Sequence, residues 1–153
     1  MQGRKGAAMK YLDLPPVWLA LAALGVWLSR SVWTAGTPFT QAAGTGLVLL
    51  GLILMGVAVV TMMRARTTVI PHRQPQALVA HGIFGLTRNP IYLGDALLLA
   101  GLCLRWQAPL GLILVPVFVW WITRHFIRPE EARLRAAFGP AFTQYATQVR
   151  RWV

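Results

Sequence analysis

Acidic side chains are scarce in this chain, and their positions narrow the chemistry that it could perform. The sequence has only four, at Asp13, Asp95, Glu130 and Glu131. Asp95 lies in an apolar stretch, so it is either a functional group or a charge that an arginine and a helix N-terminus stabilise. Glu130 and Glu131 are adjacent and point in different directions from a helix, so they cannot form a paired-carboxylate dyad. Hydrolysis by two acids is therefore not expected.

The other potentially reactive side chains do not suggest a metal site or an activated nucleophile. The three histidines, His72, His81 and His125, lack the spacing of metal ligands. No convincing nucleophile accompanies them to complete a catalytic triad. The single cysteine, Cys103, lies in an apolar run and is predicted to be a packed side chain. We therefore expect no metal and no hydrolytic site.

Polar residues gather instead in two segments, 76–92 and 128–131, which are predicted to emerge at the same membrane face. A site assembled from them could admit a soluble cofactor from the cytoplasm and an apolar substrate from lipid. The residues alone do not specify the reaction.

The composition indicates that the elements positioning these segments lie in lipid. Apolar residues make up 56% of the 153 residues and charged residues 12%. The formal net charge is +11, but the charges sit between apolar runs without a continuous basic face. Membrane lipids with anionic headgroups are therefore the expected partners, and nucleic acid is not. We expect a single domain, 1–153, divided into a two-helix part, 1–66, and a cofactor-binding core, 67–153.

Apolar runs predict about four transmembrane helices, which cover residues 15–33, 41–63, 90–104 and 110–123. Prolines at the first helical turn open the first run, and Asn89 as N-cap with Pro90 after it opens the third. The last two runs are short for a bilayer and are predicted to form a helical hairpin. Glycines in the second run are five residues apart and form no GxxxG stripe, which leaves its helix contacts unspecified.

Beyond Arg128 the pattern predicts an amphipathic helix at the membrane surface, which ends at Gly139 and Pro140. All Lys and Arg residues except Arg30 and Arg105 lie in the N-terminal tail, the long loop 64–89 or the segment from 124 onward. This distribution places both termini in the cytoplasm. The predicted fold class is an all-α integral membrane protein with a C-terminal amphipathic interfacial helix, located in a bacterial inner membrane.

Two sequence blocks carry a family resemblance. The first, Leu78-Val79-Ala80-His81-Gly82-Ile83-Phe84-Gly85-Leu86-Thr87-Arg88-Asn89-Pro90-Ile91-Tyr92-Leu93-Gly94, looks like L-V-x-x-G-x-Y/F-x-x-x-R-H/N-P-x-Y-x-G. The second contains Glu130-Glu131, Leu134, Phe138-Gly139, Tyr145 and Val149-Arg150, in the pattern E-E-x-x-L-x-x-x-F-G followed by Y and V-R. Together they resemble the isoprenylcysteine carboxyl methyltransferase and phospholipid methyltransferase family of membrane enzymes. The resemblance covers roughly residues 67–152.

The resemblance implies methyl transfer from S-adenosyl-L-methionine to a lipophilic or lipidated substrate at the cytoplasmic membrane face. The residues that it implies for cofactor binding are Gln76, Ala77, Leu78, Val79, Phe84, Asn89, Pro90, Ile91, Tyr92 and Glu130. Family enzymes place a substrate-binding arginine shortly before the acid pair, and both Arg124 and Arg128 lie near that position. The methyl acceptor, a carboxylate, an amine or a thiol, stays open.

Three positions depart from the better-known members: Asn89 and Gln76 replace histidines, and Phe84 replaces a tyrosine. Asn89 and Gln76 can still form hydrogen bonds but cannot accept a proton at neutral pH. Two other functions remain open. Gly94-Asp95 also fits the signature of NADPH-dependent sterol-type membrane reductases, and a non-catalytic membrane scaffold could keep the same fold.

Overall fold

The computed structural model describes residues 14–67 and 77–153, and every regular element in these ranges is helical. The α-helices are α2 (Pro15–Ser29), α3 (Pro38–Arg64), α4 (Pro90–Arg105), α5 (Leu114–Ile122) and α6 (Arg128–Gln148). Two short 3₁₀ helices, η1 (Gly82–Gly85) and η2 (Pro109–Ile113), precede α4 and α5, and a π-helical turn, η3 (Thr123–Ile127), joins α5 to α6. The all-helical prediction is confirmed.

The beginnings of the helices follow local sequence chemistry. Pro15 opens α2, as predicted. The helix α3 begins at Pro38, three residues before the predicted start, because Thr37 and Thr40 form a capping box. The Thr40 backbone N–H donates to Thr37 Oγ1 over 3.2 Å, and the Thr37 N–H donates to Thr40 Oγ1 over 2.8 Å.

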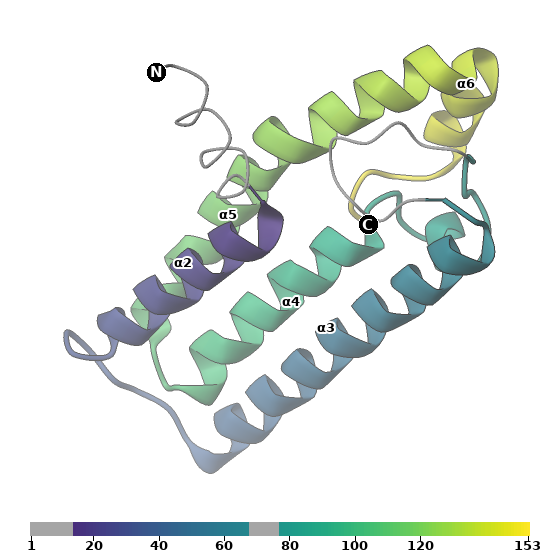
Figure 1. Cartoon of the computed structure of the whole chain (residues 1–153). Helices are drawn as coiled ribbons and strands as arrows, with labels where there is room; N and C mark the ends of the chain where they lie inside the picture. Colours follow the sequence, from purple (N-terminus) through teal and green to yellow (C-terminus); the bar gives the residue numbers. More distant parts are fainter. Residues whose placement is uncertain (1–13, 68–76) are drawn as a thin grey trace, which may run out of the picture.

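The helix α3 runs alongside α4, and glycines allow their backbones to approach closely (Figure 1). A Cβ atom added at Gly51 would lie 2.6 Å from the Gly94 carbonyl oxygen, and one at Gly101 would lie 2.7 Å from the Gly44 carbonyl oxygen. Gly46, by contrast, has nothing within 4 Å of such an atom. The contact therefore uses glycines seven residues apart on each helix, a spacing that keeps them on one helix face.

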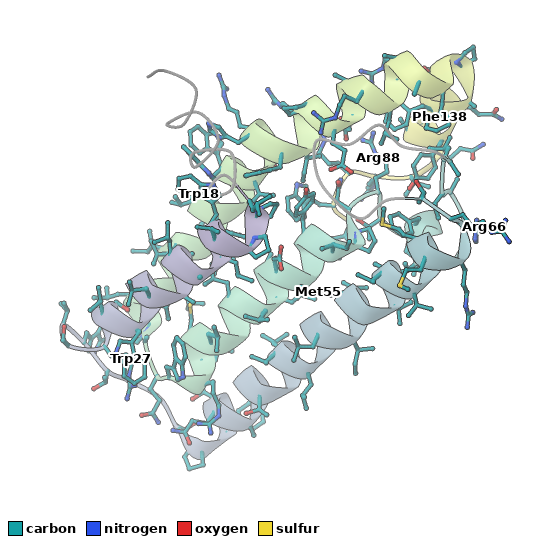
Figure 2. All side chains as sticks on the ribbon, viewed as in Figure 1. Trp18, Trp27, Met55, Arg66, Arg88 and Phe138 are labelled. Atoms are coloured by element: carbon teal, nitrogen blue, oxygen red, sulfur yellow. The ribbon has the colours of Figure 1, made fainter. Side chains whose placement is uncertain are left out.

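A core of apolar side chains lies where α2, α4 and α5 meet. Val26, Leu99 and Ile122 are fully buried there, and Cys103 is packed among them, as predicted. Tryptophans reinforce α2 along its length: Trp18 packs against Trp121 with ring centroids 4.7 Å apart, and Trp27 packs on Trp106 at 5.4 Å (Figure 2).

The last predicted transmembrane run and the predicted amphipathic helix are continuous in the structure. Residues Pro109–Gln148 form one helical run, in which η3 links α5 to α6 (Figure 1). Pro129 lies in the first turn of α6 and has no N–H to donate to the preceding turn, which accounts for the widened π turn before it. The predicted break at Gly139 is present: its φ of 51° and ψ of −121° turn the chain before Pro140.

Among residues 14–67 and 77–153, two helical runs are long and apolar enough to cross a membrane, Pro38–Arg64 and Pro109–Gln148. The 27 residues of α3 extend roughly 40 Å at about 1.5 Å per residue, more than a hydrocarbon core of about 30 Å needs. Large apolar side chains of α3, among them Leu50, Ile53 and Met63, are exposed in the isolated chain. The helices α2, with 15 residues, and α4, with 16, are shorter. Four membrane spans therefore stay a prediction, as does the interfacial position of α6.

Candidate functional site

The segment Arg88-Asn89-Pro90 leads into α4, and the side chain of its asparagine also contacts the C-terminal tail. Asn89 occupies the N-cap position and Pro90 begins the helix, but the Asn89 side chain makes no capping hydrogen bond. Its Nδ2 instead donates to the backbone carbonyl of Arg151 over 2.8 Å. The predicted N-cap position is therefore confirmed, while the side-chain amide of Asn89 joins the start of α4 to the C-terminal tail, 62 residues away.

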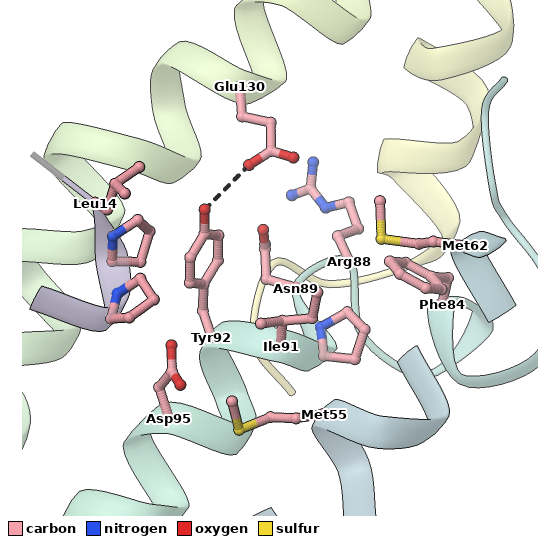
Figure 3. A pocket seen from close by; sticks show the side chains of 13 residues that line it. Leu14, Met55, Met62, Phe84, Arg88, Asn89, Ile91, Tyr92, Asp95 and Glu130 are labelled. Carbon is pink, nitrogen blue, oxygen red and sulfur yellow. Dashed lines mark hydrogen bonds between the residues drawn. The ribbon is translucent and has the colours of Figure 1, made fainter. Parts of the chain in front are cut away.

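The two sequence blocks meet at Tyr92 and Glu130. Tyr92 is in the first turn of α4 and 8% exposed, and Glu130 is in the first turn of α6. The Tyr92 hydroxyl donates to Glu130 Oε2 over 3.3 Å, although the residues are 38 positions apart (Figure 3). The fold thus brings the start of α4 and the start of α6 to one place.

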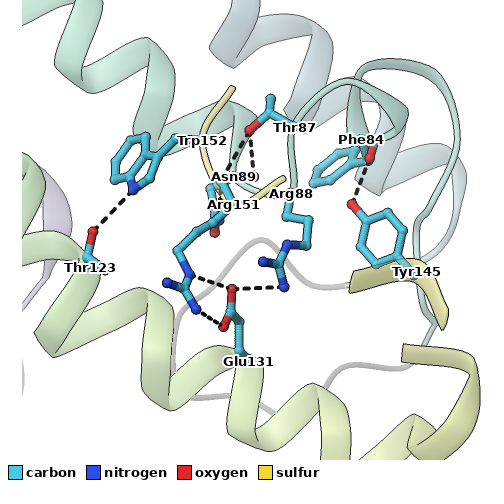
Figure 4. A network of polar contacts seen from close by, with 9 residues as sticks. All are labelled: Phe84, Thr87, Arg88, Asn89, Thr123, Glu131, Tyr145, Arg151 and Trp152. Atoms are coloured by element: carbon cyan, nitrogen blue, oxygen red, sulfur yellow. Dashed lines mark hydrogen bonds and ion pairs between the residues drawn. The ribbon is translucent and has the colours of Figure 1, made fainter. Parts of the chain in front are cut away.

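The neighbouring acid, Glu131, faces a different set of partners. Its carboxylate receives two hydrogen bonds from Arg151, from Nε over 2.9 Å and from Nη2 over 2.7 Å, and an ion pair from Arg88 Nη1 at 3.2 Å (Figure 4). Because Glu131 is 7% exposed, it needs these partners. The hydrogen bonds that Arg151 donates to Glu131 raise the pKa of Arg151 above its ordinary value.

Further bonds fasten the C-terminal tail to the same place. The backbone N–H of Arg88 donates to the Arg150 carbonyl over 3.0 Å, and Trp152 Nε1 donates to Thr123 Oγ1 over 3.2 Å. The Tyr145 hydroxyl donates to the Phe84 carbonyl over 2.7 Å. Both α6 and the tail after it therefore hold the segment that precedes α4 (Figure 4).

A cavity of about 350 Å³ lies beside the Tyr92–Glu130 pair (Figure 3). Its volume is within the usual range for a small-molecule site. Its walls are formed by the beginning of α2, the middle and end of α3, the segment before α4, the first turns of α4, and α6. The lining residues are Leu14, Pro15, Pro16, Met55, Met62, Phe84, Arg88, Asn89, Pro90, Ile91, Tyr92, Asp95 and Glu130.

The predicted cofactor residues divide into three groups. Six of them line the cavity: Phe84, Asn89, Pro90, Ile91, Tyr92 and Glu130. Three do not, namely Ala77, Leu78 and Val79; Val79 packs in a small core with Ala58 and Phe84. Gln76 lies outside the described residues. Whether any of them binds a cofactor stays a prediction.

The predicted arginines lie elsewhere than the cavity. Arg124 and Arg128 are exposed on the long helix and are not among the lining residues. The arginine that lines the cavity is Arg88, whose side chain is 13% exposed. Arg88 was not among the predicted site residues, although it directly precedes Asn89 in the first block. Met55 and Met62 of α3 also line the cavity, and no motif marks them in the sequence.

Comparison with known proteins gives the chain its family. A family model described as phospholipid methyltransferase matches residues 39–141, more than half of the chain. A probable protein-S-isoprenylcysteine O-methyltransferase of Oryza sativa subsp. japonica is 32% identical over 113 residues, which are 72% of this chain and 59% of that protein. Protein-S-isoprenylcysteine O-methyltransferase B of Arabidopsis thaliana is 31% identical over 108 residues, 69% of this chain and 55% of that protein. The chain thus spans less than two thirds of the length of these curated relatives. Because the family model matches more than half of the chain and the named relatives are isoprenylcysteine methyltransferases, the chain belongs to the phospholipid and isoprenylcysteine methyltransferase family.

Proposed function

We propose that this protein transfers a methyl group from S-adenosylmethionine to a lipophilic acceptor at the cytoplasmic face of a membrane. The observation that carries the proposal is the hydrogen bond between Tyr92 and Glu130 at the wall of the cavity. It joins the two sequence blocks at one site. The names of the relatives, O-methyltransferases that act on isoprenylcysteine, support the reaction class.

In the proposed membrane arrangement, α3 and the helical run from η2 into α6 cross the bilayer. The helices α2 and α4 are two shorter membrane spans. Arginines lie near the cavity end of the bundle, as Arg66 and Arg88 illustrate (Figure 2). Positive residues favour the cytoplasmic side. This arrangement opens the cavity toward the cytoplasm, keeps both termini there and leaves α6 at the membrane surface.

The residues around the cavity fit the chemistry of S-adenosylmethionine. The Nε of Arg88 is buried and has no hydrogen-bond partner among the described residues. A guanidinium N–H only donates and pairs well with a carboxylate, such as that of the amino-acid part of the cofactor. The Glu130 carboxylate is an acceptor suited to an ammonium or to ribose hydroxyls. We therefore assign Arg88, Tyr92 and Glu130 to cofactor binding, with Asn89 beside them.

When bound, S-adenosylmethionine supplies an electrophilic methyl group on a sulfonium that is already a good leaving group. The protein is then required mainly to hold the methyl group and the acceptor in line, which is a positioning effect. Met55, Phe84 and Ile91 give the cavity an apolar wall. Such a wall would exclude water and hold the lipophilic part of the acceptor.

Observations on the same site argue against the two other functions. Gly94, half of the Gly94-Asp95 reductase signature, lies against Gly51 and Met55 of α3, so helix packing explains why it is a glycine. A cavity lined by Tyr92 and Glu130 counts against a scaffold with a solidly packed hairpin. We propose neither alternative.

Isothermal titration calorimetry of the full chain in detergent, with S-adenosylmethionine and separately with NADPH, tests the proposal. We expect binding of S-adenosylmethionine only, and an affinity at least about tenfold lower for Glu130→Gln, because a hydrogen bond to a charged group is lost. Gln144→Ala, at an exposed polar residue further along α6, is the matched control and keeps the original affinity. Binding of NADPH without S-adenosylmethionine, or of neither, would overturn the proposal.

A further inference from the structure

Two arginines contact the carboxylate of Glu131, and they do so unequally. Arg151 holds both oxygens, from Nε over 2.9 Å and from Nη2 over 2.7 Å. Arg88 contacts only Oε1, from Nη1 at 3.2 Å, and its buried Nε has no hydrogen-bond partner among the described residues. Figure 4 shows both guanidinium groups directed at the same carboxylate. Arg88 therefore keeps hydrogen-bonding capacity that Glu131 does not use.

The charges of these three side chains do not cancel, because two guanidinium groups face one carboxylate. The Arg151 side chain is 34% exposed, so water can solvate its charge. The Arg88 side chain is largely buried and lines the cavity, where Figure 3 shows its guanidinium near the hydroxyl end of Tyr92. A buried charge requires a partner, so the unbalanced positive charge favours an anionic group that reaches Arg88 from the cavity.

Backbone contacts of the C-terminal tail fix the place from which the Arg151 side chain reaches Glu131. The Arg151 carbonyl accepts hydrogen bonds from Asn89 Nδ2 over 2.8 Å and from Thr87 Oγ1 over 3.3 Å. The backbone N–H of Arg88 donates to the carbonyl of the residue before Arg151 over 3.0 Å. None of these bonds uses the Arg151 side chain. A substitution there therefore removes the guanidinium and leaves the attachment of the tail in place.

We infer that Arg151 is a positioning residue of the cofactor site, which holds both oxygens of Glu131 and so keeps Arg88 available for the carboxylate of S-adenosylmethionine. This role rests on the proposed function. Arg151 is not among the residues that line the cavity, so it acts through the other two side chains. Without it, Glu131 offers both oxygens to Arg88, and arginine and carboxylate favour such a bidentate pair. That pair is neutral and turns Arg88 away from the carboxylate of the cofactor.

Calorimetry with two ligands distinguishes this role from a purely structural one. The full chain in detergent is titrated with S-adenosylmethionine and with its decarboxylated analogue, which keeps the sulfonium, the amino group and the nucleoside. We expect the original chain to bind S-adenosylmethionine about tenfold more tightly than the analogue, because only the former can accept charge-assisted hydrogen bonds from Arg88. Arg151→Leu is expected to bind S-adenosylmethionine about tenfold more weakly and the analogue within about twofold of the original affinity.

Arg150→Leu is the matched control for the loss of a positive charge. It changes the neighbouring residue of the tail, whose side chain is exposed, and it is expected to keep the preference for S-adenosylmethionine. Arg151→Gln is a smaller change that also removes the charge, and we expect it to lose the preference as Arg151→Leu does. Circular dichroism of each variant shows that the protein titrated is folded.

A second substitution at Glu131 provides a rescue. In the double variant Glu131→Gln with Arg151→Leu, the glutamine keeps an oxygen that accepts from Arg88 but carries no charge. The positive charge of Arg88 is then unbalanced again, as it is in the original chain. We expect the preference for S-adenosylmethionine over the analogue to return to within about threefold of its original value.

The inference is overturned if the original chain binds the two ligands equally, or if Arg151→Leu and Arg151→Gln keep the preference. Equal weakening of both ligands in these variants would assign Arg151 to the stability of the fold alone and also overturn it. So would a double variant that binds S-adenosylmethionine no better than Arg151→Leu does. Failure of the original chain to bind S-adenosylmethionine would instead contradict the proposed function.

Discussion

Glu130 and Glu131 are neighbours in sequence, yet their carboxylates belong to different parts of the structure. Glu130 accepts the Tyr92 hydroxyl at the cavity wall, and Glu131 joins Arg88 to Arg151 behind it. One acid therefore faces the cavity while the other stabilises the segment that forms it. This division leads to opposite expectations for substitutions at two adjacent positions.

Glu131→Ala is expected to destabilise the fold by about 3 kcal/mol, because it leaves the largely buried Arg88 without its ion-pair partner. Thermal unfolding in detergent, followed by circular dichroism, measures the change. Glu130→Ala serves as the comparison and is expected to leave the unfolding temperature nearly unchanged while it lowers affinity for S-adenosylmethionine. A smaller loss of stability for Glu131→Ala than for Glu130→Ala would refute the division of roles.

Gly51→Ala is expected to destabilise the α3–α4 contact by about 1–3 kcal/mol, because its Cβ would lie 2.6 Å from the Gly94 carbonyl oxygen. Gly56 provides a control on the same helix, since nothing lies within 4 Å of a Cβ atom added there. Gly56→Ala is expected to be neutral, or stabilising by up to about 1 kcal/mol through helix propensity. Thermal unfolding of both variants in one detergent measures the contrast, and equal destabilisation would count against this packing.

Tyr92→Phe removes only the hydroxyl that donates to Glu130. We expect affinity for S-adenosylmethionine to fall about fivefold to tenfold, because one hydrogen bond that orients Glu130 is lost. Calorimetry of the single variants and of the double variant with Glu130→Gln measures whether the two residues act together. If the losses of binding free energy in the two single variants simply add in the double variant, Tyr92 and Glu130 do not act as a unit.

Asn89→Asp is expected to loosen the C-terminal tail, because a carboxylate cannot donate to the Arg151 carbonyl as the Asn89 amide does over 2.8 Å. Hydrogen exchange at the backbone N–H of Arg88, which donates to the Arg150 carbonyl, reports on this contact. We expect faster exchange there and no change in the middle of α3. Unchanged exchange at Arg88 would show that the tail is held without Asn89.

The sequence predicted those parts of the fold that depend on local pattern. Apolar runs and prolines located α2, α3 and α4 to within a few residues, because length, hydropathy and helix-start chemistry are all local. The glycine contact was missed because it depends on two helices: Gly44 and Gly51 matter only opposite Gly101 and Gly94. The spacing within one helix could not reveal that.

The candidate site shows the same limit. The motif blocks marked Tyr92 and Glu130, and the structure places them within hydrogen-bond distance of each other. No sequence pattern marked Arg151, because its pairing with Glu131, 20 residues earlier, forms only when the C-terminal tail folds back. Arg88 was visible in the first block, but its nearness to the cavity depends on how the chain approaches α4.

Mass-spectrometric detection of methyl transfer tests the central claim most directly. The purified full chain in bilayer nanodiscs of bacterial membrane lipid is supplied with S-adenosylmethionine that carries a deuterated methyl group. We predict labelled methyl groups on a lipophilic molecule in the nanodisc fraction, and their loss in Glu130→Gln. A folded protein that binds the cofactor but transfers no label to any molecule of that fraction would contradict methyl transfer at this site.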